Sequence, residues 1–106
     1  KKANWALKWI DSQESFAKRL LAFACVEGIF FSASFCGIYW FRKRGLLSNG
    51  LSVANDYIAR DEGLHWQFAA ALFQEMKLSI DKKDVEEIVR EAVEIEKEFT
   101  NDAIPV

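Results

Sequence analysis

The chain has 106 residues, of which 51% are hydrophobic, 14% aromatic and 28% charged, with a single proline and five glycines. This composition fits one globular domain at most and excludes a disordered or collagen-like chain. The net charge of −2 gives no electrostatic reason to expect nucleic acid or an anionic membrane surface as a partner.

The first predicted helix covers residues 2–11 and places Trp5 and Trp9 on one face. The sequence Asp11-Ser12-Gln13-Glu14 then predicts a break and a restart, with a capping side chain and an acid in the first turn of the next helix. The opening residues lack the apolar core and cleavage site of a signal peptide. They contain no initiator methionine and start inside the helical pattern, so we expect a piece of a longer protein.

The second predicted helix is the most apolar part of the chain and runs from about residue 14 to 44. Cations at residues 42–44 followed by Gly45 predict its C-terminal end. Residues 20–41 are long enough to cross a bilayer. However, Glu27 lies inside this run, and a carboxylate near the bilayer centre costs about 3 kcal/mol or more. We therefore expect no membrane span, but a helix buried on nearly all sides in a larger helical protein.

Both cysteines, Cys25 and Cys36, fall in this predicted helix. At about 1.5 Å per residue they would lie roughly 16 Å apart, beyond the roughly 7 Å reach of a disulfide. We therefore expect a reduced protein in the cytoplasm.

A turn signal at residues 48–50 separates this helix from a third, predicted over about residues 53–77 with Ser52 as its cap. A capping box at Asp81 opens a fourth helix over about residues 82–100. We see no strand signal and no internal repeat, so the fold class is all-α.

The fourth predicted helix carries an apolar stripe and a charged face. Glu91 and Glu94 on it have the spacing of metal ligands. A solvated helix face explains this acidic pair more simply than a metal site does.

Glu27 is the first candidate site residue, because it interrupts the most apolar run. A buried carboxylate must be neutral, paired with a cation or bound to a metal, since an unpartnered buried charge costs several kcal/mol. From this helix alone, a salt bridge or a protonated acid is the commoner explanation.

Glu62 and His65 are three residues apart in the third predicted helix, so both project from one face. Glu-x-x-His is a repeating unit of di-iron carboxylate bundles, in which two helices each give a Glu and two others each give Glu-x-x-His. Carboxylate oxygen with imidazole nitrogen suits iron or manganese. The motif alone is weak, and a lone helical histidine is more often an ordinary core or surface residue. Together with Glu27 on the preceding helix, it favours a metal site.

Two long motifs make the pattern more specific. The run VEGIFFSASF at residues 26–35 and the run ARDEGLH at residues 59–65 resemble signatures of the class I ribonucleotide reductase small subunit, eukaryotic-like form. Residues 40–46 and 95–106 resemble the same family, in order. The resemblance implies a ferritin-like bundle of long antiparallel helices, with residues 1–106 forming part of a single di-iron domain.

The resemblance implies roles at the metal site. Glu27, Glu62 and His65 resemble three protein ligands of a centre with two iron ions, or manganese in their place. Asp61 resembles the acid that hydrogen-bonds an iron-ligand histidine on another helix and joins the site to the radical-transfer path. A surface acid paired with Arg60 or a lysine is the alternative for Asp61, which the resemblance makes the less favoured one.

Phe31, Phe35 and Ile58 resemble the apolar pocket around the radical tyrosine, which keeps water and reductants away. Phe31 and Phe35 follow Glu27 by four and eight residues, so a continuous helix would place them on its face. Core packing is a further role of these three residues, compatible with the first.

The resemblance implies the radical-generating subunit of ribonucleoside-diphosphate reductase, an oxidoreductase that makes deoxyribonucleotides for DNA replication. Its iron centre and oxygen generate a tyrosyl radical used by the large catalytic subunit. We expect a homodimer of small subunits as well, with neither nucleic acid nor a membrane as partner.

The chain lacks part of the family pattern. It has no second Glu-x-x-His with its additional acid, no tyrosine in the radical motif and no C-terminal docking tail. We therefore expect residues 1–106 to supply half of the metal site and to be inactive alone. Two alternatives stay open at this point: an inactive helical fragment and a homodimeric metal-binding bundle without radical chemistry. The runs at residues 26–31 and 61–65 argue against a third, an iron-storage or other oxidase bundle.

Overall fold

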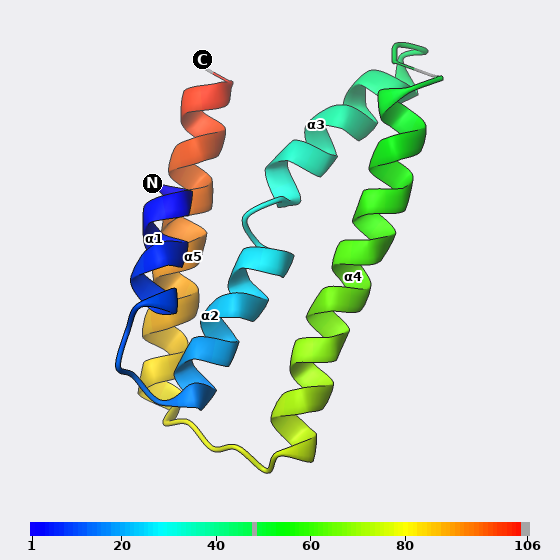
Figure 1. The fold of residues 1–106 in the computed structure, drawn as a ribbon. Helices are drawn as coiled ribbons and strands as arrows, with labels where there is room; N and C mark the ends of the chain where they lie inside the picture. The colour runs from blue at the N-terminus through cyan, green and yellow to red at the C-terminus, as the bar shows by residue number, and fades with distance from the viewer. Residues whose placement is uncertain (48, 105–106) are drawn as a thin grey trace.

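The computed structural model describes residues 1–47 and 49–104 and contains five α-helices within them (Figure 1). These helices are α1 (Lys2–Ile10), α2 (Phe16–Gly28), α3 (Ser32–Lys43), α4 (Leu51–Glu75) and α5 (Lys82–Ala103). No strand occurs in this part of the chain, so the all-α prediction is confirmed.

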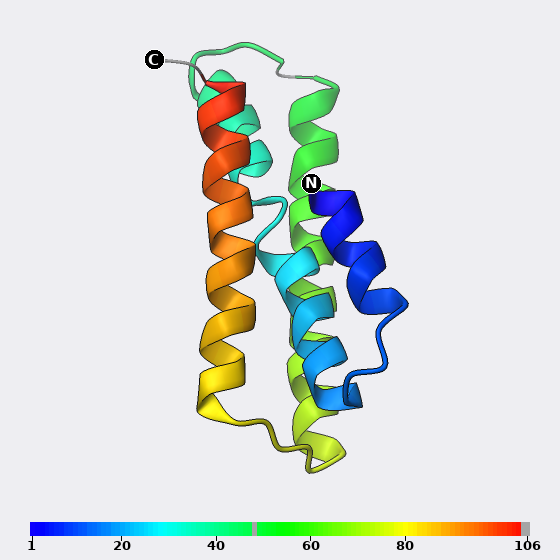
Figure 2. The same ribbon diagram turned by 90° about the vertical axis from the view of Figure 1, so that its left-hand side faces the viewer.

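The chain runs up through α2 and α3, down along α4 and up again in α5, so these long helices are antiparallel neighbours (Figure 1). The helix α2 packs against α4 on one side and against α1 and α5 on the other. Figure 2 shows α1 and α5 from this second side, with α2 behind them. The side chains of α2 are therefore divided between two different interfaces.

Local sequence signals set two of the helix ends, the start of α2 and the end of α3. The Ser15 side chain accepts a hydrogen bond from the Lys18 backbone N–H at 3.4 Å, as expected of an N-cap. The chain leaves α3 through Gly45, whose φ of 76° lies in the left-handed region that glycine adopts without strain. This helix stop was predicted and is confirmed.

Two predicted helix starts need adjustment. The helix α4 begins at Leu51 with Gly50 as its N-cap, so Ser52 lies inside the helix and is 1% exposed. Asp81 is the N-cap of α5, but its side chain makes no capping hydrogen bond. The predicted turn at residues 48–50 includes Ser48, which lies outside the described residues.

The prediction of one helix over residues 14–44 is wrong, because residues 29–31 break it into α2 and α3. No proline causes this break. Phe30 instead turns into the core, where it is 3% exposed and its ring lies 5.2 Å from that of Trp5. Burial of this large ring compensates for the interrupted helix.

The core lies between α1, α2 and α5. Its buried members are Trp5, Ala22, Cys25, Phe30, Ile88 and Ala92. Burial raises the pKa of the Cys25 thiol to about 11, so this cysteine stays protonated at neutral pH. Cys25 and Cys36 are both free, as predicted.

The opposite side of the molecule is apolar but exposed. Large side chains of α4 with half or more of their surface exposed include Tyr57, Leu64, Trp66 and Phe68. Phe16–Lys43 is the one segment of the described residues long and apolar enough to cross a membrane, and little of it is buried. The prediction of a helix buried on nearly all sides is therefore not met within this chain. Exposed apolar side chains gathered on one helix are typical of an interaction surface.

Candidate metal centre

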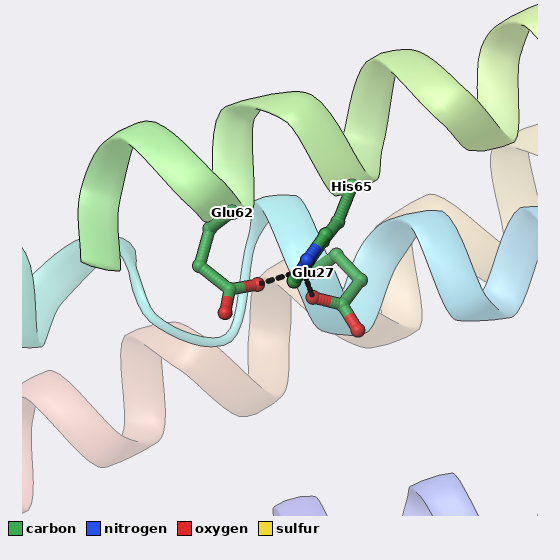
Figure 3. Close-up of side chains that lie close together, drawn as sticks. All are labelled: Glu27, Glu62 and His65. Atoms are coloured by element: carbon green, nitrogen blue, oxygen red, sulfur yellow. Dashed lines mark hydrogen bonds and ion pairs between the residues drawn. The ribbon is translucent and has the colours of Figure 1, made fainter. Parts of the chain in front are cut away.

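Three side chains of metal-ligand type converge where α2 faces α4 (Figure 3). Glu27 comes from the last turn of α2, while Glu62 and His65 lie one turn apart on α4. The Nδ1 atom of His65 is 3.1 Å from Oε2 of Glu27 and 3.4 Å from Oε2 of Glu62. One ligand atom from each residue lies within 4.8 Å of the others. The structure therefore brings together the three residues that the sequence singled out.

Gly28 permits the close approach of α2 and α4 beside this cluster. A Cβ atom at Gly28 would lie 2.8 Å from Cδ1 of Trp66, which is too short for a van der Waals contact. The absence of a side chain next to Glu27 therefore lets the indole of α4 pack against α2. No sequence pattern predicted this contact, since neither residue carries metal-binding chemistry.

The two carboxylates lie close enough for Glu27 to affect the ionisation of Glu62. A hydrogen bond with Glu27 raises the pKa of the Glu62 carboxyl, and partial burial and the charge of Glu27 raise it further, while His65 opposes the shift. A hydrogen bond with Glu27 also raises the pKa of the His65 imidazole, with a further contribution from Glu62 and an opposing effect of desolvation. The cluster therefore favours added positive charge.

A metal cation fits this arrangement. The side chains of Glu27 and Glu62 are each 18% exposed, and within the described chain no lysine or arginine pairs with them. Two carboxylates and one imidazole form a donor set suited to iron or manganese. His65 is half exposed, so the described residues enclose the cluster on one side only.

Asp61 lies beside this cluster in sequence but faces solvent. Its Oδ1 is 3.6 Å from Nη2 of Arg60, and both side chains are more than half exposed. This is the surface pairing recognised as an alternative from the sequence. The predicted partner of Asp61 is a histidine on another helix, and His65 is the only histidine here. Its radical-transfer role stays a prediction.

The three pocket residues are only partly gathered. The rings of Phe31 and Phe35 lie 6.1 Å apart, while Phe31 and Ile58 are 40% and 49% exposed. The helical spacing from Glu27 to these two phenylalanines does not hold, because the break at residues 29–31 ends α2 before Phe31. A pocket around a tyrosine therefore stays a prediction for all three residues.

Glu91 and Glu94 are not brought together as ligands. Glu91 accepts a hydrogen bond from Nε1 of Trp5 at 2.6 Å, and Glu94 pairs with Lys97 at 3.0 Å. Both acids lie on the exposed face of α5, as the sequence predicted.

Glu96 is a buried acid that the sequence analysis missed. It is 7% exposed and follows Ile88 and Ala92 of α5 at four-residue spacing, within the buried stripe of that helix. An acid in register with an apolar stripe was the signal that could have identified it.

The whole chain, residues 1–106, matches the family described as ribonucleotide reductase, small chain. The ribonucleoside-diphosphate reductase small chain of Nicotiana tabacum is 57% identical over 105 residues, which cover 99% of this chain and 32% of the relative. The small subunit of Dictyostelium discoideum is 55% identical over 106 residues, 100% of this chain and 31% of the relative. This chain thus spans about a third of the length of the curated relatives it matches.

Proposed function

This chain belongs to the ribonucleotide reductase small-chain family, and on that premise we propose that it supplies half of a di-iron site in a small subunit of ribonucleoside-diphosphate reductase. The membership also makes its all-α fold part of a ferritin-like bundle. The convergence of Glu27, Glu62 and His65 at the interface between α2 and α4 carries the functional proposal.

The chain's own residues would bind the metal and manage its charge. The carboxylates of Glu27 and Glu62 and Nδ1 of His65 would hold iron, or manganese in its place. The pKa values of Glu62 and His65 are raised, and a metal that binds these groups would displace any proton that they hold. When bound, the iron pair supplies oxygen activation and the one-electron oxidation of a tyrosine.

The neighbouring residues would protect and orient this site. Phe31, Phe35 and Ile58 would exclude water from the radical tyrosine. Asp61 would leave Arg60 and hydrogen-bond a metal-bound histidine of another helix, and such contacts orient the imidazole.

The remaining parts of the subunit would come from the rest of a longer protein. This chain spans about a third of the length of its relatives and exposes a broad apolar surface on α4. Further helices packed there would add the other metal ligands and the tyrosine. We propose a second small subunit and the large catalytic subunit as partners, a cytoplasmic location and no membrane or nucleic acid.

Metal loading of the intact protein tests this proposal. We expect Fe(II) and oxygen to give two bound irons per chain, visible absorption of oxidised iron and a tyrosyl radical by electron paramagnetic resonance. Glu62→Gln should weaken Fe(II) binding by more than the roughly 10- to 100-fold typical of outer-shell changes. Glu94→Gln is the matched control, because Glu94 is an exposed acid of α5 paired only with Lys97.

A colourless, metal-free wild-type protein would contradict the proposal and favour an inactive helical module. Metal binding without any radical would favour the alternative of a metal-binding bundle that lacks radical chemistry. Equal iron affinity of Glu62→Gln and Glu94→Gln would remove Glu62 from the site.

A further inference from the structure

Glu96 is the one buried charged residue among residues 1–47 and 49–104, and its carboxylate faces the break between α2 and α3. Its Oε1 accepts a hydrogen bond from the backbone N–H of Ala33 at 2.9 Å and lies 3.3 Å from the Ser32 hydroxyl. Amides in the first turn of a helix have no partner within it, and a carboxylate satisfies them well. Glu96 of α5 therefore caps α3 from another helix.

Lys2 of α1 completes this contact. Its Nζ lies 2.7 Å from Oε2 of Glu96 and donates a hydrogen bond to the Phe30 carbonyl at 2.6 Å. The same ammonium lies 3.5 Å from the ring centroid of Phe99. The Lys2–Glu96 pair thus binds a carbonyl of the break on one side and an amide of α3 on the other.

These contacts oppose the closure of a continuous helix. In such a helix the N–H of Ala33 would donate to the carbonyl of Ile29, four residues earlier. Here that carbonyl instead accepts from the backbone and hydroxyl of Ser32, at 3.1 and 2.7 Å. Closing the helix would separate Ala33 from Glu96 and withdraw Phe30 from the core.

The break begins two residues after Glu27, at the end of the helix that carries this ligand. We propose that Glu96 and Lys2 are positioning residues, which hold the break and thereby orient Glu27 toward Glu62 and His65. This inference rests on the proposed metal site. The contacts that carry it are made by residues of α1, α3 and α5, which lie outside the group formed by Glu27, Glu62 and His65. In some proteins, ion pairs shielded from solvent select one conformation through their directional contacts.

Two measurements on the intact protein test the inference, with Glu96→Gln and Lys2→Met as the variants. Hydrogen exchange of the amides of residues 29–35 reports the break, and Co(II) titration reports affinity and the ligand-field spectrum per folded molecule. We expect both variants to speed exchange, to weaken Co(II) binding by about tenfold and to shift the spectrum. The double variant should change the exchange rate and the Co(II) affinity no more than Glu96→Gln alone does, because both substitutions break the same ion pair.

Glu98→Gln is the matched control. Glu98 pairs with Lys1, so this pair joins the same two segments as Glu96 and Lys2 but is exposed and does not contact the break. We expect its exchange, affinity and spectrum to equal those of the wild type. If Glu96→Gln does not fold, Lys2→Met alone tests the inference, because this variant keeps the hydrogen bond from the Ala33 N–H to Glu96.

Faster exchange with wild-type affinity and spectrum would overturn the positioning role and leave the proposed metal site intact. Unchanged exchange in both variants would show that the pair does not hold the break, and would overturn the inference as well. A wild-type protein that binds neither Co(II) nor Fe(II) would instead overturn the proposed function and the positioning role together.

Discussion

The two sides of α2 differ in what this chain provides. Toward α1 and α5, side chains are enclosed: Trp5 is 5% exposed and Ala92 fully buried. Toward α4, large apolar side chains remain open, with Leu64 and Phe68 55% and 62% exposed. Glu27, Glu62 and His65 converge on this open side, while the Lys2–Glu96 pair lies on the closed side.

This difference means that the residues that support the backbone lie on one side of α2 and the proposed metal-binding residues lie on the other. The closed side completes its core with residues of this chain and holds the backbone next to Glu27. The open side presents three side chains of metal-ligand type and an apolar surface that other helices of the proposed subunit would cover. An active site built at such a seam combines a rigid support with groups from distant segments.

The largest expected effect lies on the closed side. Trp5→Ala in the intact protein should lower the free energy of unfolding by about 3–5 kcal/mol, because it removes a buried indole that contacts Phe30. Denaturant unfolding measures this loss. Leu7→Ala, on the exposed side of the same helix, should cost less than about 1 kcal/mol. Similar losses for both variants would mean that the core does not depend on Trp5.

The open side gives the next effect. Phe68→Ala should cost the intact protein about 3 kcal/mol, the value for a buried phenylalanine, if further helices cover α4 as proposed. Glu87→Ala, on the exposed face of α5, should change stability by no more than about 0.5 kcal/mol. A loss below about 0.5 kcal/mol for Phe68→Ala would show that α4 faces solvent in the intact protein.

A substitution at Gly28 would strain the interface between α2 and α4. Gly28→Ala should cost about 1–3 kcal/mol and weaken Co(II) binding, because the new Cβ would meet Trp66. Gly37→Ala, which meets nothing within 4 Å, should be neutral or stabilise its helix by about 0.5–1 kcal/mol. Thermal unfolding and Co(II) titration measure the two effects. A harmless Gly28→Ala would show that the two helices can separate without loss of the site.

The last expected effect concerns affinity rather than stability and is the pH dependence of metal binding. The raised pKa values of Glu62 and His65 mean that protons compete with the metal at higher pH than ordinary carboxyl and imidazole groups would. Co(II) affinity should therefore fall as pH falls from about 8 to 5, by up to about tenfold per pH unit for each proton displaced. Titrations at several pH values would give this slope, and Glu62→Gln should make it shallower. A flat profile would contradict proton release from these groups.

Much of the fold was predictable because its signals are local. The N-cap at Ser15, the stop at Gly45 and the order of the helices follow from side chains within a few residues of each helix end. Glu62 and His65 were predictable for the same reason, since helical spacing alone places them on one face. Glu27 required the additional observation of an acid in an apolar run.

By itself, the sequence determined where helical segments lie and which of their faces are apolar, because these depend on contacts between near neighbours along the chain. It also singled out three side chains of metal-ligand type, from their chemistry and their positions in the helical pattern. Only the tertiary structure decided the break at residues 29–31, the fit of Gly28 against Trp66 and the inward turn of Glu96. Ala33 and Glu96 are 63 residues apart. Such a bond forms only once packing has brought two helices together, so no local pattern near the break could predict it.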